Sequence, residues 1–150
     1  MAEYKIYTDG SCSTNTGKGG WGLVIVKDDR IVGEQCGSAA DTTNNKMELT
    51  AFLRGMQLME ENDNSEDVYY FYTDSSYIAN CFKDRWYQKW QANGWRTSNR
   101  MPVKNRELWE AILRIHRTSI HKIIICWTKG HADDEFNNRA DVLATSWRGE

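Results

Sequence analysis

The chain has 150 residues, 27% of them charged, and a formal net charge of −2 at pH 7. This length fits one domain with one hydrophobic core, and the composition is that of an ordinary globular protein. No apolar run approaches the ~20 residues of a transmembrane helix, and the N-terminus lacks the apolar stretch of a signal peptide, so we expect no membrane span and a cytoplasmic location.

The first three predicted elements are strands. Residues 3–8 alternate in polarity, as a half-buried strand does. Residues 20–27 and 31–38 are two more strands, and the three residues between them leave room only for a hairpin turn. These three strands should therefore be antiparallel.

Helices and strands alternate along the rest of the chain. Helix-start residues at 41–44 precede a helical pattern over residues 44–59, and a strand follows at residues 68–73. The later elements are helices at residues 75–92 and 103–118, a strand at 120–128 and a helix at 136–147. Strands separated by helices should lie parallel to the first strand. The pattern predicts an α/β domain over residues 1–150, with a mixed five-stranded sheet (three antiparallel strands, then parallel strands) and helices on both faces.

The cysteines show no metal-binding pattern. None of them, and no histidine, has the spacing of a zinc site. In a reducing cytosol we expect free thiols at all four positions, Cys12, Cys36, Cys81 and Cys126.

Two strand ends carry a matching signature. The first strand ends in a Thr-Asp-Gly-Ser sequence around Asp9, and the fourth ends in a Thr-Asp-Ser sequence around Asp74. If these strands are parallel neighbours, both carboxylates emerge at the sheet edge where α/β proteins place their sites. Crowded carboxylates repel each other unless a cation lies between them, and oxygen ligands favour Mg²⁺, with Mn²⁺ as a substitute. Taken singly, Asp9 could instead belong to a tight turn, and Asp74 could be a helix N-cap.

Glu48 is a third candidate ligand. On the helix at residues 44–59 it shares a face with Ala51, Phe52, Gly55 and Met59. That face should pack on the sheet, where a carboxylate is unusual unless it is paired or metal-bound. The alternative is a residue at the edge of the face that reaches solvent.

Two further residues are weak candidates by themselves. Asp141 lies beside the apolar stripe of the last helix, where it could simply interact with the helix N-terminus. His131 lies in a Gly-containing loop just upstream, where a histidine is usually a surface residue.

Residues 83–106 hold seven basic residues and one acidic residue, Asp84. A local basic patch can bind phosphates although the whole chain is acidic, whereas the alternative is a solvated helix surface. The basic residues are Lys83, Arg85, Lys89, Arg96, Arg100, Lys104 and Arg106.

An ordered set of motifs resembles the type 1 ribonuclease H family. The matching segments are residues 8–12, 42–49, 73–75, 94–97, 102–105 and 129–132, and Asn137-x-x-x-Asp141. Each motif alone is weak, but together they follow the family's order and approximate spacing over almost the whole chain. The resemblance implies a single ribonuclease H-like catalytic domain.

The resemblance also implies the chemistry. Asp9, Glu48, Asp74 and Asp141 would be the metal-binding carboxylates of an endonuclease that hydrolyses the RNA strand of an RNA–DNA hybrid. The implied mechanism uses two Mg²⁺ ions, one activating the attacking water and one stabilising the leaving 3′-oxygen, and yields 5′-phosphate and 3′-hydroxyl ends. His131 resembles the family's histidine that assists proton transfer or product release.

Substrate contacts are implied in the same way. Asn15, Asn44 and Asn45 would contact the minor groove of the hybrid, where the 2′-hydroxyl distinguishes RNA from DNA. The residues that would hold the DNA strand are Thr43 and Asn105 in a phosphate pocket, Trp86 and Trp90 along the sugar–phosphate track, and Lys104 in the basic protrusion. Local roles remain open, namely turn and cap for Asn15 and Asn44, and packing for the tryptophan pair.

Three departures from the family pattern predict modest affinity and low processivity. Asp41 stands where the family often has Arg, and Ser76 replaces a longer polar side chain. Residues 91–93, Gln-Ala-Asn, make the protrusion less basic, and the length leaves no room for an added hybrid-binding domain.

Other functions remain open at this stage. One is a related carboxylate/Mg²⁺ nuclease that acts on DNA junctions, and another is a non-catalytic hybrid-binding module. The asparagine set favours the hybrid, and the presence of all four carboxylates argues against a degenerate site. A small-molecule or protein-binding domain would leave the ordered motifs unexplained. We expect a monomer with no obligate protein partner.

Overall fold

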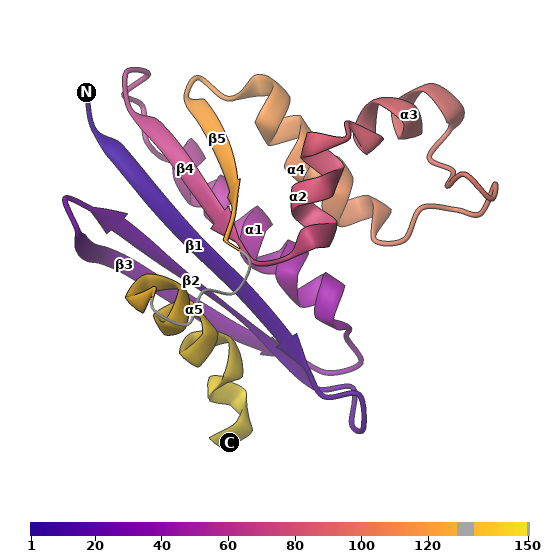
Figure 1. Cartoon of the computed structure of the whole chain (residues 1–150), viewed down its shortest axis with the longest axis horizontal. Helices are drawn as coiled ribbons and strands as arrows, with labels where there is room; N and C mark the ends of the chain where they lie inside the picture. The colour runs from indigo at the N-terminus through magenta and orange to yellow at the C-terminus, as the bar shows by residue number, and fades with distance from the viewer. Residues whose placement is uncertain (129–133, 150) are drawn as a thin grey trace.

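The computed structural model describes residues 1–128 and 134–149. Its strands and α-helices, labelled in Figure 1, are β1 (Glu3–Cys12), β2 (Gly19–Lys27), β3 (Arg30–Ala39), α1 (Asn44–Glu60), β4 (Val68–Thr73), α2 (Ser76–Lys83), α3 (Trp86–Asn93), α4 (Arg106–Thr118), β5 (Lys122–Trp127) and α5 (Glu135–Thr145). A 3-10 turn, η1 (Ser146–Gly149), follows α5. None of the helices in these two ranges is both long and apolar enough to cross a membrane.

The strands form one mixed sheet in the order β3-β2-β1-β4-β5. β1 pairs antiparallel with β2, and β2 with β3, whereas β4 lies parallel to both β1 and β5. This arrangement confirms the predicted sheet. The parallel register places Thr8 beside Thr73, so the next residues, Asp9 and Asp74, lie at the same edge.

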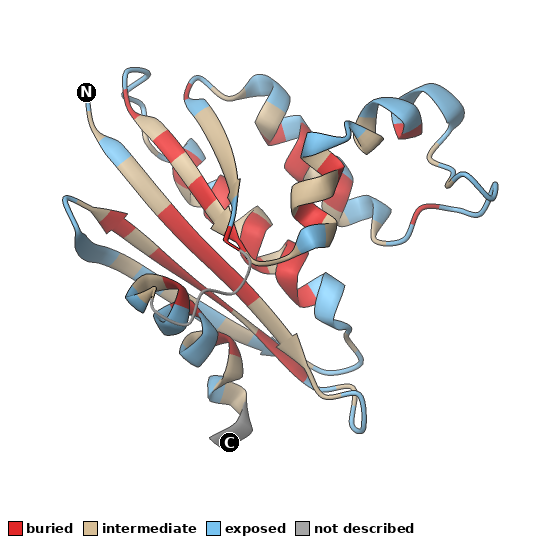
Figure 2. Cartoon of the chain, in the orientation of Figure 1, coloured by how far each residue is buried: buried red, intermediate tan, exposed pale blue. Residues whose placement is uncertain are grey.

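Helices cover both faces of the sheet, as predicted. α5 lies on one face against β1 and β2, while α1 lies on the other face and carries α4 on its outer side (Figure 1). Buried residues follow β1, β4, α1 and α4 (Figure 2), and the main core includes Ile6, Phe52, Phe71 and Trp109. The core therefore fixes the sheet and α1, the two elements that carry three of the candidate carboxylates.

The prediction of one continuous helix over residues 75–92 is wrong. The chain breaks between α2 and α3 at Arg85, which has a left-handed φ of 55°. In a continuous helix Trp90 would point roughly 150° away from the direction shared by Ile78 and Cys81. The break allows all three side chains to be buried. α3 and the loop after it consequently project away from the sheet (Figure 1).

The helix predicted from residue 103 begins instead at Arg106. Asn105 has a left-handed backbone with φ 61°, which is incompatible with the helix interior. Val103 is buried ahead of the helix. This short segment between α3 and α4 therefore presents residues 103–105 at the base of the projecting loop.

Candidate active site

Three of the predicted carboxylates meet at the carboxyl edge of the sheet. Carboxylate oxygens of Asp9, Glu48 and Asp74 all lie within 4.8 Å of one another. They line a hollow that we call the carboxylate cleft. Its lining residues are Asp9, Gly10, Ser11, Cys12, Asn44, Asn45, Glu48, Asp74, Ser75, Ser76, Tyr77 and Asp141.

The local alternatives for the two aspartates do not fit the structure. Asp9 lies within β1 and pairs with Gly22 of the neighbouring strand β2, so it is not part of a tight turn. The N-cap of α2 is Ser75, whose hydroxyl accepts a hydrogen bond from the Ile78 backbone N–H at 3.2 Å. The carboxylate of Asp74 is therefore not the cap of this helix, and it remains at the cleft.

Glu48 reaches the cleft because α1 passes very close to β1. A Cβ atom at Gly10 would lie 2.3 Å from the backbone nitrogen of Glu48, so only glycine permits this approach. Glu48 is only 9% exposed, which contradicts the alternative of an edge residue reaching solvent. Its Oε2 atom is buried and has no hydrogen-bond partner among the described residues. A buried carboxylate oxygen without a partner is costly, and a bound cation would offset that cost.

Asp141 lies on the same cleft from the opposite face of the sheet. It is in the middle of α5 and is exposed, so interaction with the helix N-terminus does not explain its position. That end of α5 is capped instead by Asp134, whose carboxylate accepts hydrogen bonds from the backbone of Phe136 and Asn137.

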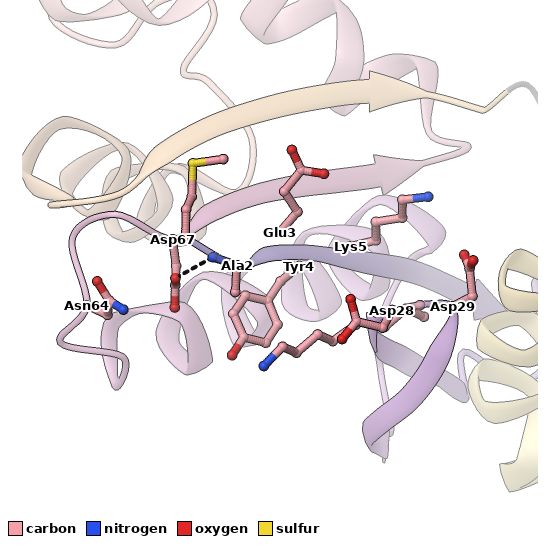
Figure 3. Close-up of a pocket in the computed structure, with 11 residues that line it drawn as sticks. Ala2, Glu3, Tyr4, Lys5, Asp28, Asp29, Asn64 and Asp67 are labelled. Carbon is pink, nitrogen blue, oxygen red and sulfur yellow. Dashed lines mark hydrogen bonds between the residues drawn. The ribbon is translucent and has the colours of Figure 1, made fainter.

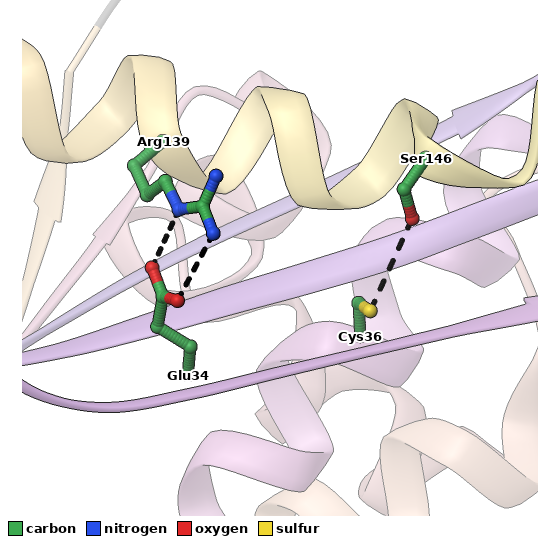
Figure 4. Close-up of polar contacts among 4 residues, drawn as sticks. All are labelled: Glu34, Cys36, Arg139 and Ser146. Carbon is green, nitrogen blue, oxygen red and sulfur yellow. Dashed lines mark hydrogen bonds and ion pairs between the residues drawn. The ribbon is translucent and has the colours of Figure 1, made fainter. Parts of the chain in front are cut away.

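Close backbone contacts hold α5 in place. A Cβ atom at Gly22 would lie 2.7 Å from the Ala140 carbonyl oxygen, so α5 packs directly on β2. On the outer side, Arg139 donates two hydrogen bonds to the Glu34 carboxylate of β3, at 2.6 and 3.1 Å (Figure 4). The hydroxyl of Ser146 also contacts Cys36 Sγ at 4.0 Å (Figure 4). The position of Asp141 is thus fixed by the docking of its whole helix.

The clustered carboxylates are held in an environment that disfavours their charge. Burial, the nearby charge of Asp74 and contact with Asp141 raise the pKa of Asp9 to about 8. Burial, and then the charges of Asp9 and Asp74, raise the pKa of Glu48 well above its ordinary value, and burial likewise raises the pKa of Asp74. A cation between these groups would offset both burial and repulsion. The all-oxygen donor set and the unpartnered Glu48 oxygen fit a hard divalent metal ion.

A second hollow, the basic groove, adjoins the carboxylate cleft and follows α3 and the loop to α4. Its lining residues are Thr43, Asn45, Lys46, Tyr77, Trp86, Lys89, Trp90, Asn93, Arg96, Thr97, Ser98, Met101, Pro102, Val103, Lys104 and Asn105. Four of these residues are basic, and no acidic residue is among them. Asn45 and Tyr77 line both hollows, so the cleft and the groove are neighbours on one surface.

The two groove tryptophans also build the wall behind it. Trp90 is 8% exposed, with its ring stacked on Trp95 at 5.6 Å and edge-on to Trp109 at 5.6 Å between centroids. Trp86 is half-buried, and its ring centroid is 6.3 Å from that of Trp90. The packing role that the sequence left open is therefore present, and the same side chains line the groove.

Comparison with known proteins identifies the family. A sequence model of the RNase H family matches residues 1–148. The chain belongs to the RNase H family. The chain is accordingly an endoribonuclease of a metal-dependent family.

Relatives within the RNase H family align with nearly the whole chain. Ribonuclease H of Acetivibrio thermocellus is 44% identical over 145 residues, covering 97% of this chain and 94% of the relative. Ribonuclease H of Ehrlichia chaffeensis is 43% identical over 141 residues, covering 94% and 91%.

Solved RNase H structures agree with the fold. The crystal structure of LC9-RNase H1, described as a type 1 RNase H with the type 2 active-site motif, superposes with a TM-score of 0.81 at 27% identity, covering 99% of this chain and 73% of that one. The solution structure of the PFV RNase H domain superposes with a TM-score of 0.79 at 23% identity, covering 97% and 94%. The latter supports the fold alone.

The two hollows of this RNase H family member contain most of the substrate-contact residues suggested by the sequence. Those that line the basic groove are Thr43, Asn45, Trp86, Trp90, Lys104 and Asn105. Asn44 lines the carboxylate cleft, and Asn15 is exposed in the turn after β1 and lines neither hollow. His131 lies outside the described residues. Of the departures from the family pattern, Ser76 lines the cleft, while Asp41 is exposed and lines neither hollow.

The structure also assigns a local capping role to Thr43 and adds two residues to the groove. Thr43, rather than Asn44, is the N-cap of α1, and its hydroxyl accepts from the Lys46 backbone N–H at 3.1 Å. Lys46 and Tyr77 also line the groove, although no sequence pattern indicated a site role for either residue. The available signal for Tyr77 was its place three residues after Asp74, in the first turn of α2.

A third hollow lies at the opposite end of the sheet, beside the start of β1 (Figure 3). There the Asp67 carboxylate accepts a hydrogen bond from the Ala2 backbone N–H at 2.8 Å. In the described ranges, the only group of three acidic, cysteine or histidine side chains placed to share a metal ion is the one in the carboxylate cleft. The third hollow is therefore remote from the proposed metal site and contains no such group among the described residues.

Proposed function

We propose that the carboxylate cleft is the catalytic centre with which this chain hydrolyses the RNA strand of an RNA–DNA hybrid. The metal-binding residues would be Asp9, Glu48, Asp74 and Asp141, within a single catalytic domain spanning residues 1–150. The observation that carries the proposal is the convergence of three carboxylates, within 4.8 Å, in a chain whose family acts on such hybrids.

The protein's contribution is to hold its carboxylates in fixed places. Asp9 is part of β1, Glu48 lies on the buried face of α1, and Asp74 directly follows β4. When bound, divalent metal ions supply an activated water and stabilise the charge on the leaving 3′-oxygen. We propose Mg²⁺, with Mn²⁺ as a substitute, because every donor is a carboxylate oxygen. Products would carry 5′-phosphate and 3′-hydroxyl ends.

Substrate selection would use both hollows. Asn44 and Asn45 lie beside the carboxylates, and an amide can both donate to and accept from a 2′-hydroxyl. The basic groove, with Lys89 and Lys104, would hold phosphates of the DNA strand. We propose that a monomer suffices, since one chain lines both hollows. A contact from Asn15, the role of His131 and the cytoplasmic location remain predictions.

The decisive experiment compares nucleic acids and metals. Purified protein is incubated with end-labelled RNA–DNA hybrid, single-stranded RNA, duplex RNA, duplex DNA and a DNA junction, with Mg²⁺, with Mn²⁺ or with EDTA. We expect metal-dependent cleavage confined to the RNA of the hybrid, with 5′-phosphate product ends. Cleavage of the junction but not the hybrid, or hybrid binding without cleavage, would contradict the proposal.

A further inference from the structure

Ser11 lies where the carboxylate cleft meets α5. It lines the cleft, is half-buried, and follows Asp9 by two residues in β1, so both side chains point to the same face of the sheet. Asp9 is opposite Gly22 in the register of β1 and β2, and Ser11 is opposite Gly20. Because α5 packs against both glycines, this shared face is the one that α5 covers. The proposed chemistry gives the Ser11 hydroxyl no role.

The Ser11 hydroxyl makes two contacts, and both are with the C-terminal end of α5 and the turn after it. It donates to the Ala144 carbonyl oxygen at 3.1 Å and accepts from the Trp147 indole N–H at 3.4 Å. Ala144 lies in the last turn of α5, where carbonyl groups lack partners within the helix. A hydroxyl has one hydrogen to donate, and here that hydrogen binds α5.

The backbone of α5 lies directly on β2 at this point. A Cβ atom at Gly20 would lie 2.5 Å from the Ala144 carbonyl oxygen, and one at Gly22 would lie 2.7 Å from the Ala140 carbonyl oxygen. Packing of this kind fixes the distance between helix and strand, but it is non-directional and leaves the rotation of the helix less restricted. The Ser11 hydrogen bond supplies a directional contact on the side of the cleft.

Asp141 is the candidate metal ligand that α5 carries, and its place depends on that rotation. It precedes Ala144 by three residues, which is about one helical turn and ~4.5 Å along the axis. The three carboxylates within 4.8 Å of one another come instead from β1, α1 and the residue after β4. Movement of α5 would therefore displace Asp141 and leave the other three in place.

We propose that Ser11 is a positioning residue for Asp141. Its hydroxyl fixes the rotation of α5 on the sheet and thereby sets how far the Asp141 carboxylate reaches into the cleft. Metal affinity then has two contributions, one from the three clustered carboxylates and one that Asp141 adds with the support of Ser11. The inference rests on the proposed function, in which Asp141 is a metal ligand.

The first test is Ser11→Ala, with Mn²⁺ as the probe and binding measured by calorimetry without nucleic acid. We expect Kd to rise about 3- to 10-fold, somewhat less than the 10- to 100-fold typical of groups that orient a ligand directly. The Mg²⁺ concentration needed for cleavage should rise by a similar factor, while KM for the hybrid at saturating Mg²⁺ stays within about twofold. An unchanged Kd for Mn²⁺ would overturn the inference.

Ser146→Ala is the matched control. It makes the same chemical change at the end of α5, but Ser146 Oγ contacts Cys36 Sγ at 4.0 Å, on the outer strand β3 (Figure 4). This variant should bind Mn²⁺ as the wild-type protein does, and Ser11→Thr, which keeps the hydroxyl, should retain most of the affinity. Equal losses in Ser11→Ala and Ser146→Ala would contradict a specific role for Ser11.

A double-mutant cycle tests whether Ser11 acts through Asp141. Asp141→Asn should itself weaken Mn²⁺ binding, and adding Ser11→Ala to that variant should change Kd by less than about twofold, because the carboxylate that it positions is absent. If the two substitutions instead multiply their effects on Kd, Ser11 acts on other groups and the inference is wrong.

A measurement on the wild-type protein keeps the inference testable even if Ser11→Ala does not fold. The Trp147 indole N–H donates to the Ser11 hydroxyl, so its NMR resonance reports on this contact. We expect the resonance to shift when Mg²⁺ is added, and to shift much less in Asp141→Asn. A resonance that does not respond to Mg²⁺ in the wild-type protein would overturn the inference. Failure of the proposed function is distinct, because hybrids would then remain uncut although Ser11→Ala weakened metal binding.

Discussion

The carboxylate cleft and the basic groove are neighbours, yet they are built in opposite ways. The cleft places charges of one sign on strands and on a buried helix face, where the backbone of Gly10 nearly touches that of Glu48. The groove carries positive charges on exposed lysines, and these surround tryptophans that also pack in the core. The backbone therefore fixes the proposed chemical centre, whereas side chains with more freedom form the proposed binding surface. Single changes should have large effects in the cleft and graded effects in the groove.

The largest effect should come from removing one charge in the cleft. Asp74→Asn keeps the shape of the side chain but offers a weaker metal ligand, and we expect kcat to fall roughly 10³-fold, the scale seen for loss of one key electrostatic group. Hybrid binding should persist, because the groove is unchanged. The measurements are single-turnover cleavage and a binding titration.

The control for this variant is Asp63→Asn, an exposed aspartate in the loop before β4. It makes the same chemical change far from the cleft and should cleave hybrids at the wild-type rate. If Asp74→Asn cleaved as well as this control, the assignment of the metal-binding carboxylates would be wrong.

The second effect tests whether the backbone fixes the cleft. Gly10→Ala adds a Cβ that would lie 2.3 Å from the backbone of Glu48, so α1 must move away from β1. We expect activity to fall about 10- to 100-fold, as for loss of support around a metal ligand, and the free energy of unfolding to fall by about 1–3 kcal/mol. Cleavage assays and denaturant unfolding measure the two quantities.

Gly33→Ala is the matched control in β3. Its added Cβ would make ordinary contacts, the nearest at 3.5 Å to the flexible end of Ile25. This variant should retain activity and stability. Similar losses in both variants would mean that glycine replacement in the sheet, rather than displacement of Glu48, causes the effect.

The third effect is the graded response of the groove. Lys89→Gln or Lys104→Gln should raise KM about 3- to 10-fold at low salt, leave kcat unchanged, and reduce the slope of log affinity against log salt by about one unit. Lys122→Gln, at the exposed start of β5, is the control with the same charge change. If the slope of log affinity against log salt were unchanged, the DNA strand would not bind at these lysines. A wild-type protein that binds very tightly at high salt would contradict the predicted modest affinity.

The same contrast explains what could be predicted from the sequence. Residues of the cleft follow strand ends and a helix face, whose periodicities can be recognised in a sequence, so Asp9, Glu48 and Asp74 could be placed together from the sequence alone. The groove depends on the helix break at Arg85 and on the left-handed backbone of Asn105. These two residues set the directions of α3 and of the chain entering α4, and hydrophobic periodicity does not predict such changes of direction. For this reason a single helix was predicted over residues 75–92, and Tyr77 was not singled out.

The smallest effect is a pH dependence of stability in the metal-free protein. The pKa values of Asp9, Glu48 and Asp74 are raised in the folded state, that of Asp9 from 3.8 to about 8. Groups with raised pKa values stabilise the fold fully below their unfolded pKa, and this stability is lost as pH rises through the folded pKa. The melting temperature in EDTA should therefore fall by several degrees between about pH 4 and pH 8, since each kcal/mol corresponds to about 2–4 °C in a domain of this size.

Three comparisons test whether the carboxylates of the cleft cause this fall of melting temperature with pH. Asp9→Asn should flatten it, because the variant has one charge fewer to suppress. Mg²⁺ should raise the melting temperature more at pH 8 than at pH 5, since metal ions bind the deprotonated carboxylates. Glu34, whose pKa is lowered mainly by its hydrogen bonds with Arg139, has the opposite sign and loses its contribution only as pH falls below its ordinary value of 4.5. A wild-type protein with no slope, or an unchanged slope in Asp9→Asn, would show that the cleft does not store this repulsion. The cation would then have less to offset than the geometry indicates.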